Sequence, residues 1–139
     1  MTKAIKRELR FPQSPGAVWR SLTDSAALAE WMYPNDFEPR VGHCFTFRVP
    51  PKPRLEKGLV VRCEVLSCVP ESELVFSWIV DDFLDTRVSY RLEPDGAGTR
   101  VFFEHTGFEQ EPALRGSDYG WKLMHGKLEA LLTQPRRIS

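Results

Sequence analysis

Apolar and polar residues alternate most cleanly from Thr86 to Glu93, where Val88, Tyr90 and Leu92 share one face. A repeat of two residues indicates a β-strand with one buried face. Similar alternation, together with one almost wholly apolar run at Leu74 to Val80, predicts six strands: Lys3 to Phe11, Cys44 to Val49, Gly58 to Val69, Leu74 to Val80, Thr86 to Glu93, and Arg100 to Thr106. Short turns join the strands from Gly58 onward, and Asp95-Gly96 suits a tight hairpin. We therefore expect an antiparallel meander.

The last periodic segment, Ser117 to Thr133, follows a helical repeat instead. Its large apolar residues recur at intervals of three, four and three positions: Trp121, Met124, Leu128 and Leu131. This spacing predicts an amphipathic helix with one apolar stripe. Gly120 and Gly126 each cost such a helix about 1 kcal/mol relative to alanine. We therefore expect a neighbouring segment to approach the helix closely at these two positions.

Two short helices are predicted between the first and second strands. Ser14 and Pro15 are typical of a helix start, and this helix extends to Leu22. Asp24 or Ser25 then caps a second helix that ends near Trp31.

These elements predict an α+β domain in which a curved antiparallel sheet lies against the long C-terminal helix. We expect one domain over residues 1–135, followed by a short tail at 136–139. A curved sheet that grips a single helix leaves space beneath it, and such a gap is a natural place for an apolar ligand.

The composition narrows the functional classes. In a chain of 139 residues, 42% are hydrophobic, and 19 basic residues balance 19 acidic ones. A net charge of zero gives no strong field to attract nucleic acid or an anionic membrane surface. No apolar run is long enough to cross a membrane, and the first residues do not form a signal sequence. Together with an odd count of three cysteines, these features predict a cytoplasmic protein that does not insert into membranes.

No cofactor, metal or catalytic set is expected. Cys63 and Cys68 fall on opposite faces of one strand, and the neighbouring side chains of His43 and Cys44 also diverge. The acidic stretch at residues 81–85 is typical of a solvated turn. The chain has no phosphate-binding loop, dinucleotide fingerprint or nucleophile elbow.

Six short motifs, each weak alone, occur together in a specific order. They are Val18-Trp19, Leu22 to Asp24 before Trp31, Pro70 followed by Glu73 to Trp78, Gly98 to Val101, His105 to Phe108, and Gly120-Trp121 before Leu128. In this order they resemble the START-like superfamily (SRPBCC, pollen-allergen-like). Within it they are similar to the AHSA-like branch, named for the activator of the heat-shock protein 90 ATPase. The resemblance covers Ile5 to Leu132, and it implies a helix-grip fold with six or seven strands and a cavity beneath the C-terminal helix.

Eight residues are candidates for the lining of this cavity: Trp31, Trp78, Tyr90, Phe103, His105, Trp121, Met124 and His125. Aromatic rings supply large apolar area, and a buried phenol or imidazole needs a hydrogen-bond partner. The alternative for every one of them is a structural role in a filled core.

We expect a protein that binds an apolar or amphipathic small molecule. A second hypothesis is an enzyme of the cyclase or dehydratase kind, as some superfamily members are, with His105, Tyr90 or His125 as acid or base. It requires at least two of these groups to converge on a pocket. A third is a module that contacts a chaperone or another protein, although no large exposed apolar stripe favours it. A homodimer is compatible with the sequence.

Overall fold

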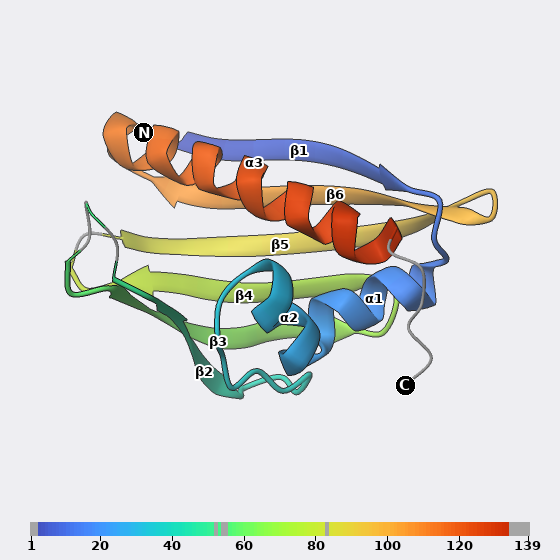
Figure 1. Cartoon of the computed structure of the whole chain (residues 1–139), viewed down its shortest axis with the longest axis horizontal. Coiled ribbons are helices and arrows are strands. Elements are labelled where there is room, and N and C mark those ends of the chain that lie inside the picture. The colour runs from blue at the N-terminus through green and yellow to red at the C-terminus, as the bar shows by residue number, and fades with distance from the viewer. Residues whose placement is uncertain (1–2, 52, 54–55, 83, 134–139) are drawn as a thin grey trace.

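The computed structural model describes residues 3–51, 53, 56–82 and 84–133. In this part of the chain six antiparallel strands form one sheet in the order β1-β6-β5-β4-β3-β2. They are β1 (Lys3–Phe11), β2 (Cys44–Val49), β3 (Leu59–Val69), β4 (Glu73–Val80), β5 (Leu84–Asp95) and β6 (Gly98–Phe108). Three helices lie on one face of the sheet: α1 (Pro15–Thr23), α2 (Ser25–Trp31) and α3 (Glu111–Thr133) (Figure 1). The predicted α+β helix-grip fold is confirmed, with six strands; the predicted tail at 136–139 lies outside the described residues.

The alternation that predicted β5 is confirmed by its burial. Val88, Tyr90 and Leu92 are almost completely buried. Tyr90 pairs with Phe103 of β6, whose side chain is also fully buried. The hairpin between β5 and β6 turns tightly, and Gly96 adopts the positive φ of 62° that favours glycine.

The two short helices begin at side-chain caps. The Ser14 hydroxyl accepts a hydrogen bond from the Ala17 amide at 3.3 Å, just before α1. Asp24, one of the two predicted caps, accepts from the Ala27 amide at 3.0 Å and begins α2. At the end of α2 the Trp31 side chain is fully buried, and its indole N–H donates to the Ser21 carbonyl at 2.9 Å. This buried hydrogen bond joins the two short helices.

The long helix differs from its prediction at its beginning. α3 begins at Glu111, whereas the sequence predicted a beginning at Ser117. The prediction missed the first two turns because they are mostly exposed and carry no apolar stripe. Contacts with β1 hold these turns in place: Lys3 forms an ion pair with Glu111, and Arg7 Nη2 lies 2.7 Å from Asp118 Oδ1. The apolar face of β1 is interrupted at Arg7 because this side chain reaches α3. Arg7 lies in the middle of the strand.

Candidate functional site

A groove runs along one side of α3. The helix packs against β1 and β6 and also contacts α1 and α2 (Figure 1). On its opposite side it leaves a groove of about 860 Å³ over the inner face of β2 to β5. Small-molecule sites typically have roughly 300–1,000 Å³. The side chains from the sheet and its connections that line the groove are Tyr33, Val49, Pro50, Leu59, Val61, Trp78, Val80 and Leu84. The residues from α3 are Gly116, Ser117, Tyr119, Gly120, Trp121, Leu123, Met124, Gly126, Lys127 and Ala130.

Three of the eight candidate residues line this groove: Trp78, Trp121 and Met124. The two indole rings lie against each other, with centroids 5.1 Å apart. The other five lie outside the groove lining, in the buried core beneath it: Trp31, Tyr90, Phe103, His105 and His125. The candidates therefore divide into a groove wall and a packed layer behind it.

His105 belongs to a buried chain of hydrogen bonds that connects the two tryptophans. The Trp121 indole N–H donates to His105 Nδ1 at 2.8 Å, so the ring proton resides on Nε2. His105 Nε2 then donates to the Thr86 hydroxyl at 2.7 Å, and that hydroxyl donates to the Trp78 carbonyl at 2.7 Å. Burial disfavours the imidazolium and lowers the pKa of His105 to about 3. His105 is thus a neutral residue that holds the Trp121 ring in place.

Tyr90 and His125 form a second buried pair. The Tyr90 hydroxyl lies 3.0 Å from His125 Nε2. Burial raises the pKa of Tyr90 well above its usual value. It also lowers the pKa of His125 to about 3, to which the nearby positive charge of Arg7 contributes. Both side chains are therefore neutral at pH 7. Within the described residues His125 Nδ1 has no hydrogen-bond partner.

These two sets do not assemble an acid–base site. His105 is bonded to Trp121 and Thr86, whereas Tyr90 is bonded to His125. None of the three proposed acid or base residues lines the groove. A proton transfer to a bound molecule requires hydrogen-bond reach of about 2.6–3.2 Å. The three side chains therefore do not converge on this groove.

The glycines of α3 explain why a groove exists at this position. The expected close approach at Gly120 and Gly126 is wrong: a Cβ added at either position would meet nothing within 4 Å. The same holds for Gly116, and all three glycines line the groove. At these three positions the helix carries no side chain that would fill the groove.

Replacing Gly120 by alanine is expected to raise the free energy of unfolding by about 0.5–1 kcal/mol, because alanine is the better helix former and no neighbour obstructs its methyl group. Urea denaturation followed by circular dichroism would measure the change. Gly98→Ala is the matched control and is expected to destabilise, since its Cβ would lie 2.3 Å from the Phe11 carbonyl oxygen. A destabilised Gly120→Ala protein would show that packing requires this glycine.

Several groove residues were not predicted from the sequence, among them Tyr33, Tyr119 and Lys127. Tyr33 follows α2 in a loop without periodicity, so no pattern gives its direction. Tyr119 and Lys127 lie on the polar flank of α3, where an exposed residue is the ordinary expectation. The one available signal was the set of glycines, which break the helical pattern without a cap or turn to explain them.

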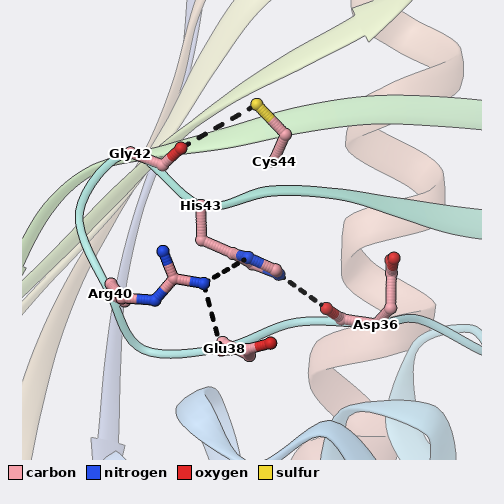
Figure 2. Close-up of polar contacts among 6 residues, drawn as sticks. All are labelled: Asp36, Glu38, Arg40, Gly42, His43 and Cys44. Atoms are coloured by element: carbon pink, nitrogen blue, oxygen red, sulfur yellow. Dashed lines mark hydrogen bonds and ion pairs between the residues drawn. The ribbon is translucent and has the colours of Figure 1, made fainter.

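The three cysteines lie apart from the groove lining. Cys44 is exposed, Cys63 buried and Cys68 partly buried. Figure 2 shows His43 turned away from Cys44: its Nδ1 lies 3.2 Å from Arg40 Nη2, and its Nε2 lies 2.8 Å from the Asp36 carbonyl oxygen. Among the described residues, no three His, Cys, Asp or Glu side chains form a group that could hold a metal ion.

Comparison with known proteins agrees with this architecture. A protein from Mesorhizobium loti, MLL2253, is 32% identical with a TM-score of 0.85, and the match covers 96% of this chain and 100% of that one. CV1439 from Chromobacterium violaceum shares the fold at 19% identity and a TM-score of 0.84, over 95% and 98% of the two chains. CalU16 from Micromonospora echinospora also shares the fold, at 23% identity and a TM-score of 0.80 over 95% and 77%.

A search of curated proteins found no match to this chain. None of the helices in the described ranges is long and apolar enough to cross a membrane. Residues 12–133 match the family described as activator of Hsp90 ATPase homolog 1-like proteins. This match spans most of the chain and agrees with the fold, the order of the six motifs and the relative from Mesorhizobium loti. The protein therefore belongs to the activator of Hsp90 ATPase homolog 1-like family, within the SRPBCC superfamily.

Proposed function

We propose that this protein binds an apolar or amphipathic small molecule in the groove beside α3. The observation that carries the proposal is a groove of about 860 Å³ whose sheet side consists mainly of apolar side chains and whose helix side is opened by glycines. Burial of apolar surface provides about 25 cal/mol per Å², so such a groove favours an apolar guest over water.

The groove wall is also rigid. Trp121 is 1% exposed and is held by the hydrogen bond to His105, while Trp78 is 7% exposed and packs against Trp121. Side chains that are fixed before binding lose little conformational entropy when a ligand arrives. We therefore assign Trp78, Trp121 and Met124 to the ligand contact surface, and His105 to its support.

The test uses the neutral dye N-phenyl-1-naphthylamine, whose fluorescence rises when it enters an apolar site. Wild-type protein is expected to bind the dye saturably. Gly120→Leu places a side chain in the groove and is expected to weaken binding by about tenfold or more, which corresponds to 1.4 kcal/mol of lost interaction.

Lys122→Leu is the control, because it introduces the same side chain on the same helix at an exposed position outside the groove lining. It is expected to bind the dye as wild type does. Absence of saturable binding to wild type, or equal binding by wild type and Gly120→Leu, would refute the proposal. Circular dichroism would verify that both variants are folded.

The homodimer stays a prediction that light scattering would test.

A further inference from the structure

We infer that the ligand of the groove is an amphipathic anion whose negative group is bound by the Lys127 ammonium. This inference rests on the proposed function and specifies its ligand class. The groove is apolar along most of its length, and the charge in its lining is of one sign only. Among the described residues that line it, Lys127 carries a positive charge and none is an aspartate or glutamate. An anionic guest would therefore meet attraction without repulsion from the groove lining.

Lys127 is available for such a contact. Its side chain is exposed, and within the described part of the chain it takes part in no hydrogen bond and no ion pair. Glu30 of α2 borders a neighbouring depression together with Lys127, but the two side chains form no ion pair. Arg7, in contrast, is engaged by Asp118 at 2.7 Å. The lysine thus offers all three of its N–H donors.

Tyr33 is a second donor in the groove lining. Tyr33 is half-buried, and its hydroxyl has no hydrogen-bond partner among the described residues. Burial raises the pKa of Tyr33, so the phenol stays protonated and can donate. Tyr33 closely follows Trp31 of α2, whose ring lies 6.0 Å from that of His125 on α3. This contact places the end of α2 beside the segment of α3 that carries Lys127.

The groove extends away from Lys127 along the helix. From Lys127 back to Gly116 the helix rises by about 16 Å, at 1.5 Å per residue. Along this stretch the helix side of the lining includes Trp121, Leu123 and Met124 beside the glycines, and Trp78 packs against Trp121. An elongated molecule with an acidic head near Lys127 and Tyr33 and an apolar body toward Gly116 matches this arrangement. A carboxylate fits the point charge of a lysine.

The test compares three ligands with equal alkyl chains and different head groups: decanoate, 1-decanol and decyltrimethylammonium. Each competes with bound N-phenyl-1-naphthylamine at pH 7 and low ionic strength. Decanoate is expected to bind about two- to fivefold more tightly than decanol, as for an exposed ion pair, and the cation is expected to bind most weakly. Added salt should reduce the difference, since it screens exposed charges.

Lys127→Gln is expected to remove the preference for decanoate, because the affinity for decanoate falls by more than the affinity for decanol. Lys122→Gln is the matched control, since this exposed lysine of α3 does not line the groove, and it should retain the preference. Equal binding of decanoate and decanol to wild type, or a loss in Lys127→Gln that affects both equally, would overturn the inference and leave the proposed function intact. If no competitor displaces the dye and the dye itself does not bind, the proposed function fails as well.

Discussion

Replacing Trp121 by alanine is expected to lower the free energy of unfolding by about 3–5 kcal/mol, the usual cost of truncating a buried aromatic residue. Trp121 is 1% exposed, and its ring centroid lies 4.8 Å from that of Phe103 and 5.1 Å from that of Trp78. The variant also removes the donor to His105 Nδ1 and leaves a buried acceptor unsatisfied, which adds to the cost. Urea denaturation monitored by circular dichroism measures the difference.

Two further variants separate the contributions at this position. Trp121→Phe keeps an aromatic ring but lacks the N–H donor, so it is expected to lose less stability than Trp121→Ala. Tyr119→Ala truncates another aromatic residue of α3 that is 64% exposed, and it should change the free energy of unfolding by no more than about 0.5 kcal/mol. If Trp121→Ala unfolded at the wild-type urea concentration, Trp121 could not be a core residue.

Acidification from pH 7 to pH 5 is expected to destabilise the protein by up to about 4 kcal/mol through two buried histidines. The pKa of His105 and that of His125 are each about 3 in the folded protein, against about 6.5 in an unfolded chain. Between these values the unfolded chain binds more protons, so stability rises with pH. The stabilisation is fully present above about pH 6.5 and is lost progressively as the pH falls toward 3.

Each histidine contributes about 2 kcal/mol of this loss, from 1.36 kcal/mol per pH unit below 6.5. Urea denaturation at several pH values between 7 and 5 would measure the slope. His125→Gln is expected to reduce the slope by about half, because one titrating group is removed. A free energy of unfolding that does not vary between pH 7 and pH 5 would contradict this prediction. It would show that protonation of the two imidazoles does not favour the unfolded chain.

Residue type alone does not distinguish the residues that line the groove from those that pack in the buried layer behind it. Aromatic and polar residues occur in both, yet Trp78 and Trp121 border open space while Tyr90 and His125 are packed against each other. A histidine with a pKa far from its usual value often marks a functional site. Here the shift arises from burial, and the hydrogen bonds of His105 support a tryptophan of the groove wall.

The elements and the faces that they bury could be predicted from the sequence. The alternation in β5, the Asp95-Gly96 turn and the spacing of Trp121, Met124 and Leu128 each depend on residues close together in the chain. The order of six short motifs was sufficient to indicate the family and its fold. The first turns of α3 were missed because they are exposed, and a helix without a buried stripe has no periodic signal.

The location of the groove was decided by the tertiary structure. It depends on the lateral position of α3 over the sheet, which contacts between distant parts of the chain determine, such as Arg7 with Asp118. The cost of Gly120 to helix stability can be predicted from the sequence. Whether a side chain at this position would meet a neighbour or open space cannot. By itself the sequence therefore determined the fold and the buried face of each element. Which of the inward residues line a groove and which fill the core followed only from packing, because a cavity is a property of the space between elements.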